Sequence, residues 1–307
     1  MNICLNCAGW VSLSKSSRKT TPRIFHRTRK IEAFIVISSR EDPFEVCKES
    51  AMSADDRLSN EKKHGEFISE HGEEIWNWSS PAGRRRWARR CRLFKEFIGN
   101  THSRVLEIGC GTGLFTEELA RTDNTILAID ISEALIMKAK ERVSSANVAF
   151  IVGNACETEF ASGSLDFIVG SSSLHHLEVK SALKEFIRIL KPGGGMMFTE
   201  PNMMNPQVAL TKNVPFIKRR AGDSPDETAF SRWDIAEKLR RFGFVDVSVE
   251  PFDFLHPQTP ARLLNLAERL TRRVEKTPLV REIAGSLIIR CRKDADVPKS
   301  GDIPLSF

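Results

Sequence analysis

Three glycines, Gly109, Gly111 and Gly113, directly follow a short apolar run, Val105–Ile108. Glycine lets the backbone turn sharply and lets a ligand approach with no Cβ in the way. If a helix follows such a turn, its free N–H groups face the ligand. The spacing therefore predicts a cofactor-binding turn between a strand and a helix, without yet saying which cofactor binds.

The neighbours of these glycines narrow the choice of cofactor. Leu114 stands where the dinucleotide-binding fingerprint requires glycine, and no Gly-Lys-Ser/Thr follows to make a phosphate-binding P-loop. Glu107 precedes the first glycine by two residues. A carboxylate aimed at the turn would repel a pyrophosphate, but it suits a cofactor that carries a cationic amino group and a sulfonium.

With these features the segment Val105–Gly113 resembles motif I of the class I S-adenosylmethionine (SAM)-dependent methyltransferases. The resemblance extends over residues 103–200 and implies that Asp130 accepts the two ribose hydroxyls, which requires a bidentate acceptor. It also implies that Asn154 receives the adenine amino group. The cofactor residues implied in this way are Glu107, Gly109, Cys110, Gly111, Gly113, Asp130, Ile131, Asn154, Ala155 and Ser171.

Residues 165–201 are most similar to small-molecule enzymes such as the quinone C-methyltransferase group. The loop Leu174-His175-His176-Leu177 and the pair Glu200-Pro201 carry this similarity. The nucleic-acid amino-methyltransferases have Asn/Asp-Pro-Pro-aromatic where this chain has Ser171–Leu174, and the cytosine-C5 enzymes have a Pro-Cys nucleophile that is missing here. We therefore expect a small-molecule acceptor, methylated at O, N or C, and no stable nucleic-acid partner.

Two histidines are the candidates for a general base, because imidazole titrates near neutral pH. We favour His176 over His175, and the alternative is that one of them packs as a neutral side chain. Glu200 either orients the substrate or bonds to backbone donors at a strand end. Trp76 either lines the acceptor pocket or packs in a lid, and we expect no metal site.

Short apolar runs alternate with helical patterns, which predicts βαβ units and a parallel sheet. The resemblance implies a Rossmann-like α/β fold with seven strands, helices on both faces and an antiparallel last strand. The expected strands are 105–108, 126–129, 148–152, 165–169, 195–199, 244–249 and 283–291, and the expected helices include 114–120, 133–143, 179–190, 234–242 and 261–275. The stripe Trp87, Cys91, Phe94 and Ile98 predicts a further helix, capped by Ser80-Pro81.

The chain divides into three expected parts. Residues 1–51 are interpreted as a disordered extension, with an organellar targeting peptide over residues 1–30 as the alternative. Residues 52–100 are expected to form a helical lid. Residues 101–298 form the SAM-binding domain, with insertions near 201–230 and 251–280 that enclose the acceptor.

Composition leaves two other functions open. The net charge of +6, the isoelectric point near 9.0 and the cluster Arg84–Arg92 fit an enzyme that acts on RNA or protein, although a solvated helix face is the simpler explanation. A non-catalytic SAM-binding module is the third hypothesis. No apolar run approaches the roughly 18 residues of a membrane span, so we expect a cytoplasmic protein with peripheral membrane contact at most and predict no oligomeric state.

Overall fold

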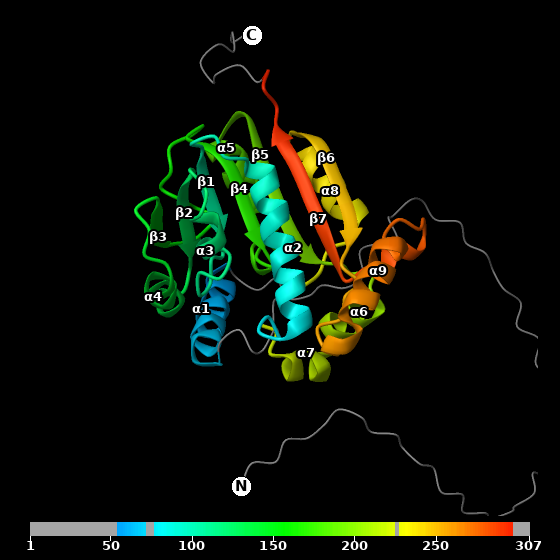
Figure 1. Cartoon of the computed structure of the whole chain (residues 1–307). Coiled ribbons are helices and arrows are strands. Elements are labelled where there is room, and N and C mark those ends of the chain that lie inside the picture. The colour runs from blue at the N-terminus through cyan, green and yellow to red at the C-terminus, as the bar shows by residue number, and fades with distance from the viewer. Residues whose placement is uncertain (1–53, 72–76, 225–226, 297–307) are drawn as a thin grey trace, which may run out of the picture. The chain divides into compact units, whose positions relative to one another are not determined.

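Seven strands form one sheet in the order β3-β2-β1-β4-β5-β7-β6 (Figure 1). The computed structural model describes residues 54–71, 77–224 and 227–296 of the 307 residues. The strands are β1 (Arg104–Ile108), β2 (Thr125–Asp130), β3 (Val148–Val152), β4 (Leu165–Ser171), β5 (Leu190–Pro201), β6 (Phe244–Phe252) and β7 (Ser286–Lys293). β7 runs antiparallel to β5 and β6, and the other neighbours pair in parallel, which confirms the predicted Rossmann-like sheet.

The central strands are continuous apolar runs because both of their faces are covered. Alternate residues of a strand point to opposite faces. In β1, Val105 joins Phe94 and Ile98 in one core cluster, whereas Leu106 joins Phe186 in the other. The two clusters therefore hold a helical layer against each face of the sheet.

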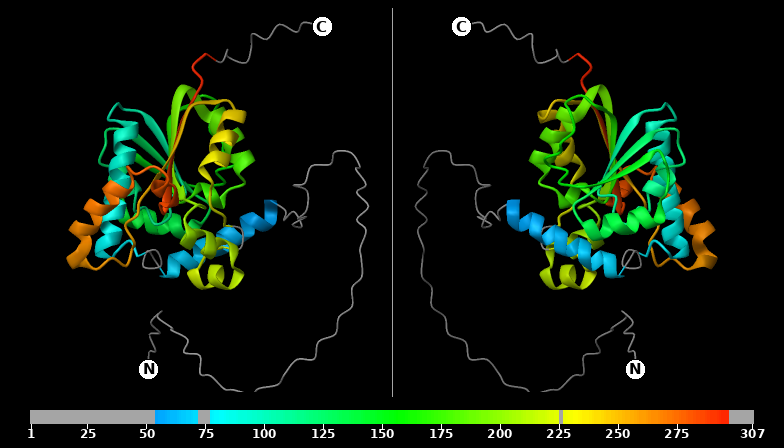
Figure 2. Two further views of the ribbon diagram at one scale, coloured as in Figure 1. Left: turned by 90° about the vertical axis from the view of Figure 1, so that its right-hand side faces the viewer. Right: turned by 90° about the vertical axis from the view of Figure 1, so that its left-hand side faces the viewer.

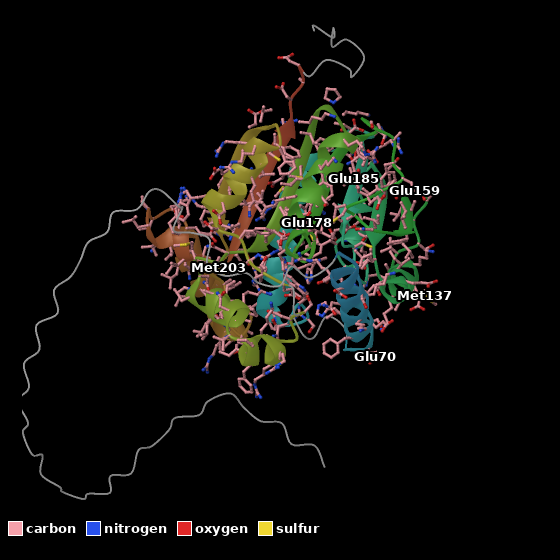
Figure 3. All side chains as sticks on the ribbon, turned by 180° about the vertical axis from the view of Figure 1, so that it is seen from behind. Glu70, Met137, Glu159, Glu178, Glu185 and Met203 are labelled. Atoms are coloured by element: carbon pink, nitrogen blue, oxygen red, sulfur yellow. The ribbon has the colours of Figure 1, made fainter. Side chains whose placement is uncertain are left out.

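The helices and single turns are α1 (Ala54–His71), α2 (Pro81–Ile98), α3 (Thr116–Leu119), α4 (Glu133–Arg142), η2 (Leu174–His176), α5 (Val179–Ile189), α6 (Pro206–Asn213), α7 (Pro215–Ala221), α8 (Arg232–Arg241), η3 (Ala261–Leu263), α9 (Leu264–Val274) and η4 (Val280–Ile283). α2, α3 and α4 cover one face of the sheet, and α5 and α8 cover the other (Figure 2). The view from behind shows the second layer, with Glu178 and Glu185 at α5 (Figure 3). Among the described helices, none combines the length and apolar character that a membrane span requires.

α2 begins where the Ser80-Pro81 pair predicts. The Ser80 side chain accepts a hydrogen bond from Gly83 N, and Pro81 occupies the first turn. Cys91, Phe94 and Ile98 are buried as predicted, whereas Trp87 is only half-buried. The helix thus forms part of the layer that covers β4 and β5.

Several predicted boundaries were wrong. The helix expected at 114–120 is a single turn, Thr116–Leu119, because residues just before it form a turn closed by Gly113 N donating to Cys110 O at 2.9 Å. The fifth strand starts at Leu190 instead of Gly195, since Lys191–Gly194 pass into the strand without a separate loop. The 201–230 insertion forms two short helices, α6 and α7, each with a proline in its first turn.

Candidate active site

The glycine turn follows β1 at the carboxyl edge of the sheet. Gly109 N and Cys110 N both donate to the Ile129 carbonyl of β2, at 2.9 and 3.1 Å. Gly109 has a φ of 65° and Gly111 a φ of 53°, and both values favour glycine. A Cβ on Gly109 would lie 2.7 Å from Ser173 Cβ, whereas one on Gly111 would meet no atom within 4 Å. The turn is therefore closed on the Gly109 side and open at Gly111, where a ligand can approach.

Two carboxyl groups lie at the turn, the partly buried Asp130 and the buried Glu107. Asp130 accepts hydrogen bonds from Gly111 N and Ser132 N, each at 2.9 Å, yet burial raises its pKa above the usual value. Glu107 is only 4% exposed, and the Thr116 hydroxyl donates to its Oε2 at 2.7 Å. Burial, with the nearby Asp130 charge, raises the pKa of Glu107 to about 8 against the effect of the Thr116 hydrogen bond. A positively charged ligand would lower the pKa of both carboxyl groups and favour their charged forms.

The remaining residues of the predicted cofactor site lie on neighbouring strand ends. Asp130 ends β2 and Ile131 follows it, Asn154 and Ala155 follow β3, and Ser171 ends β4. Asn154 Oδ1 accepts from Cys156 N at 2.9 Å, and Ser171 Oγ accepts from the Thr199 hydroxyl at 3.0 Å. Because β3, β2, β1 and β4 are consecutive in the sheet, these groups form a continuous row along its edge. We call these residues, together with Glu107 and the glycine turn, the cofactor row.

Glu200 holds the loop that leaves β4. Its Oε1 accepts from Ser173 N and Leu174 N at 3.0 and 2.9 Å, and its Oε2 contacts His175 Nδ1 at 2.6 Å. Burial opposes a charge on His175, but the carboxylates of Glu200 and Glu227 raise its pKa to about 9. His175 is therefore a protonated, buried group that fixes the loop.

His176 lies in a second group of charged side chains, drawn from segments far apart in the sequence. Its Nδ1 is 2.8 Å from Glu61 Oε2 on α1 and 3.8 Å from Glu227 Oε1. His64, one turn after Glu61, stacks on His176 with a ring separation of 5.7 Å, and its Nε2 lies 3.6 Å from Glu227. Burial opposes the charge on Glu61, but His176 lowers its pKa. We call Glu61, His64, His176 and Glu227 the His176 cluster.

Ligand atoms of His175, His176 and Glu227 lie within 4.8 Å of one another, a spacing at which such side chains hold metals. All three residues already have partners, because Glu227 Oε2 contacts Lys212 Nζ, His176 Nδ1 contacts Glu61 and His175 Nδ1 contacts Glu200. The Lys212 ammonium, which also binds Asp223 at 2.7 Å, places positive charge against the carboxylate that a cation would need. We interpret the group as a network of ion pairs and hydrogen bonds around the loop that leaves β4.

Little in the sequence indicates the His176 cluster beyond His176 itself. Glu61 and His64 have the i, i+3 spacing of one helix face, and Asp223 and Glu227 lie in a short acidic segment. These patterns alone do not predict that α1 and the 222–230 segment reach the same loop. Trp76, the other expected substrate residue, lies outside the described residues.

Most of the Arg84–Arg92 cluster pairs with acids of the same chain. Arg85, Arg86 and Arg89 bind Glu268, Asp253 and Glu275. Asp253, whose position after the sixth strand would suit a substrate wall, is itself buried in these ion pairs. The cluster therefore joins α2 to the second insertion.

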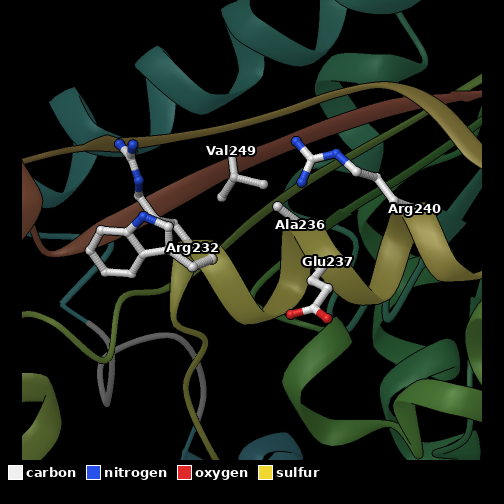
Figure 4. A pocket seen from close by; sticks show the side chains of 6 residues that line it. Arg232, Ala236, Glu237, Arg240 and Val249 are labelled. Atoms are coloured by element: carbon white, nitrogen blue, oxygen red, sulfur yellow. The ribbon is translucent and has the colours of Figure 1, made fainter.

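A shallow depression between α8 and β6 is lined by Arg232, Trp233, Ala236, Glu237, Arg240 and Val249 (Figure 4). No residue of the cofactor row or the His176 cluster lines it. The depression is therefore separate from the candidate active site.

Comparison with known proteins identifies the domain that carries this site. Residues 106–198 match a family model described as a methyltransferase domain. Over these residues the chain carries the methyltransferase domain of the class I SAM-dependent methyltransferases. Its cofactor is therefore SAM, and the open face at Gly111 beside the carboxyl groups of Glu107 and Asp130 fits that cation.

Curated relatives of this methyltransferase match it over part of their length. A demethylmenaquinone methyltransferase of Renibacterium salmoninarum is 30% identical over 165 residues, which are 51% of this chain and 66% of the relative. An uncharacterized methyltransferase of Mycobacterium tuberculosis is 30% identical over 105 residues, 33% of this chain and 53% of the relative. The chain thus spans about half to two thirds of the length of these relatives.

Solved structures share the fold. A SAM-dependent methyltransferase of Thermotoga maritima superposes with a TM-score of 0.55 at 20% identity, covering 75% of this chain and 100% of that one. Phosphoethanolamine N-methyltransferase 2 of Haemonchus contortus, in complex with SAM, gives 0.51 at 20% identity, covering 77% and 56%.

Proposed function

We propose that this methyltransferase transfers the methyl group of SAM to a small-molecule acceptor bound against the His176 cluster. The observation that supports this most is the position of that cluster. It is attached to the loop that leaves β4, next to the strand ends that carry the cofactor residues. An acceptor there would lie between the cofactor and a group of titratable side chains.

SAM, when bound, supplies an electrophilic methyl group on a leaving group that is already activated by its positive charge. We propose that Asp130 holds the ribose and Asn154 the adenine, and that Glu107 balances the cationic end. Holding the acceptor in line with the methyl group then supplies much of the rate acceleration.

His176 is our choice for the group that takes the acceptor's proton. Its Nδ1 faces the Glu61 carboxylate at 2.8 Å, so Nδ1 carries the hydrogen and the lone pair of the neutral ring is at Nε2. A carboxylate behind a histidine orients the ring and stabilises its charged form. His175 is protonated at neutral pH, and we assign it a positioning role.

We propose that α1 covers the bound cofactor as a lid. A Cβ on Gly65 of α1 would lie 2.5 Å from Ser132 Cβ, so glycine permits close contact with the start of α4. Lys138 of α4 also donates to the Ser69 carbonyl of α1. Glu61, on the same helix, contacts His176 Nδ1 at 2.8 Å, which supports the proposal that α1 helps to form the acceptor site.

For the acceptor, an activated aromatic ring is the first candidate. The relative from Renibacterium salmoninarum is named for demethylmenaquinone, and the sequence similarity around His175 and Glu200 points to the same group. Methylation of a ring carbon releases a proton, which matches a histidine base. The pairing of α2 arginines with acids of the chain weakens the RNA alternative, and the complete cofactor row weakens the non-catalytic one.

Cofactor binding is the first test. Calorimetric titration with SAM should give a measurable affinity, and Asp130→Ala should weaken it by about 2–3 kcal/mol, or roughly 30- to 150-fold. Asp234→Ala, at an exposed position on α8, is the matched control and should change nothing. Absence of SAM binding by the unaltered chain would overturn the proposal.

The proton acceptor is tested by transfer of labelled methyl groups to a panel of naphthoquinols, catechols and amines. With an acceptor that turns over, His176→Gln should lower kcat about 10²-fold or more and remove the lower limb of its pH profile. Glu61→Gln should keep part of the activity, since the glutamine oxygen still accepts the Nδ1 hydrogen but no longer carries a charge that stabilises the protonated ring. If His176→Gln leaves the profile unchanged, the histidine is only a packing residue.

A further inference from the structure

Helix α9 presents leucines to solvent on one side and packs on the other. Leu264 is buried against Ala82 and Leu255. Leu266 and Leu270 on α9 are 51% and 49% exposed, and Leu263, at the end of η3 just before the helix, is 45% exposed. Their spacing of three and four residues places them along one stripe. A stripe of this kind is normally covered by another apolar surface.

In the same segment the acidic side chains are paired within the chain, whereas the exposed charged side chains are basic. Between residues 261 and 283 the only acids are Glu268, Glu275 and Glu282, which turn inward to pair with Arg85, Arg89 and Arg232. The exposed charges are all positive: Arg262, Arg269, Arg272, Arg273 and Lys276. We call the exposed leucines and cations of 261–276 the α9 surface.

A similar combination occurs on the other insertion. Phe216 of α7 is 66% exposed and is followed by the exposed Arg219 and Arg220. α6, α7 and α9 lie at the same end of the sheet in every view (Figures 1 and 2). Apolar and basic side chains therefore occur together at the end of the molecule where the two insertions leave β5 and β6.

We propose that the α9 surface binds an anionic lipid bilayer. An amphipathic helix with leucines on one side and flanking arginines lies in the membrane interface, with its apolar stripe among the acyl chains and its cations among the phosphates. Charge complementarity selects this occupant, because all exposed charges of the segment have one sign. Lipid binding goes beyond the proposed reaction and can be measured without it.

The experiment is flotation of the full chain with vesicles of phosphatidylcholine alone or with about 30% phosphatidylglycerol. The chain should float with the anionic vesicles and at least tenfold less with the neutral ones. Leu266→Gln with Leu270→Gln, and separately Arg272→Gln with Arg273→Gln, should each lower the partition coefficient about tenfold or more. SAM binding, measured in parallel, should be unchanged in both variants.

Matched controls lie elsewhere on the surface. Met137→Gln replaces a 60% exposed side chain on α4, at the other edge of the sheet from α9 (Figure 3), and Arg240→Gln with Arg241→Gln removes two exposed cations from α8. Both controls should bind vesicles like the unaltered chain. Equal flotation with both vesicle types, or full binding by the α9 variants, would overturn the proposal. A concentration-dependent dimer abolished by the leucine changes, without flotation, would instead assign the surface to a second copy.

Discussion

Glu107 and Asp130 are carboxylic acids held in surroundings that oppose their charge. Burial raises the pKa of both groups, and the charge of Asp130 raises the pKa of Glu107 further. Both carboxyl groups also raise the pKa of the nearby Cys110 thiol. Without a cation, and at a pH between 4.5 and 8, Glu107 stays protonated in the folded chain but is ionised in an unfolded chain. The glycine turn is therefore a site with unfavourable electrostatics that its cofactor improves.

The stability of the cofactor-free protein should consequently fall with pH because of Glu107. Its folded pKa is about 8 and its ordinary value 4.5, so its contribution is complete below pH 4.5 and is lost as the pH rises through 8. Glu107→Gln keeps a side chain that accepts the Thr116 hydrogen bond and does not titrate. Between pH 6 and 9 the unfolding free energy should fall by on the order of 3 kcal/mol more in the unaltered chain than in this variant.

Urea unfolding followed by circular dichroism at several pH values measures this difference. Glu159→Gln, at an exposed position, serves as the control and should follow the unaltered chain (Figure 3). Parallel pH curves for the unaltered chain and Glu107→Gln would show that Glu107 is ionised in the fold at neutral pH, contrary to its raised pKa.

The cofactor row could be predicted from sequence because its geometry is local. Asp130 ends a strand and Gly109 and Asn154 closely follow one, and the order of strands in the sheet brings them together. Glu61 and Glu227 could not be found in this way. Their place beside His176 depends on how α1 and the 222–230 segment pack, and no periodicity in the sequence encodes that packing.

At the level of elements, α2 is joined to the end of β6 by a buried ion pair. Arg90, 2% exposed, donates to Asp253 Oδ2 at 2.8 Å and to Ser286 Oγ at 2.9 Å. Burial lowers the pKa of Arg90 to about 10, so it remains charged at neutral pH. Helical periodicity predicted the apolar stripe of α2 but not Arg90, because a buried arginine depends on a partner that lies 163 positions away in the sequence.

Breaking this pair should be costly. Asp253 has a φ of 72°, which asparagine tolerates, so Asp253→Asn removes the charge with little backbone strain. The variant leaves Arg90 buried without its counter-ion and should lower the unfolding free energy by about 3–5 kcal/mol. Glu268→Gln, which removes the partner of the exposed Arg85, should lower it by less than about 1 kcal/mol. Urea unfolding measures both variants. Similar losses of unfolding free energy in Asp253→Asn and Glu268→Gln would show that the buried ion pair does not stabilise the fold more than the exposed one.

At the scale of the whole molecule, the net charge of +6 is less informative than its distribution. Arginines of α2 are neutralised within the chain, whereas those of the α9 surface face outward between leucines. A polyanion such as RNA would use only the cations, and a bilayer would also use the leucines. The salt dependence of binding therefore distinguishes an RNA partner from a bilayer.

RNA binding, if any, should be weak and independent of sequence. With about five cations involved, the affinity for single-stranded RNA should fall by about 3.5 orders of magnitude between 0.05 and 0.5 M salt. Vesicle binding should fall less over this range, because leucine burial is not screened. Leu266→Gln with Leu270→Gln should remove this salt-resistant part while leaving RNA binding unchanged. Fluorescence anisotropy with RNA oligonucleotides and vesicle flotation measure the two curves. Sequence-selective RNA binding that survives 0.5 M salt would favour an RNA acceptor over a small molecule.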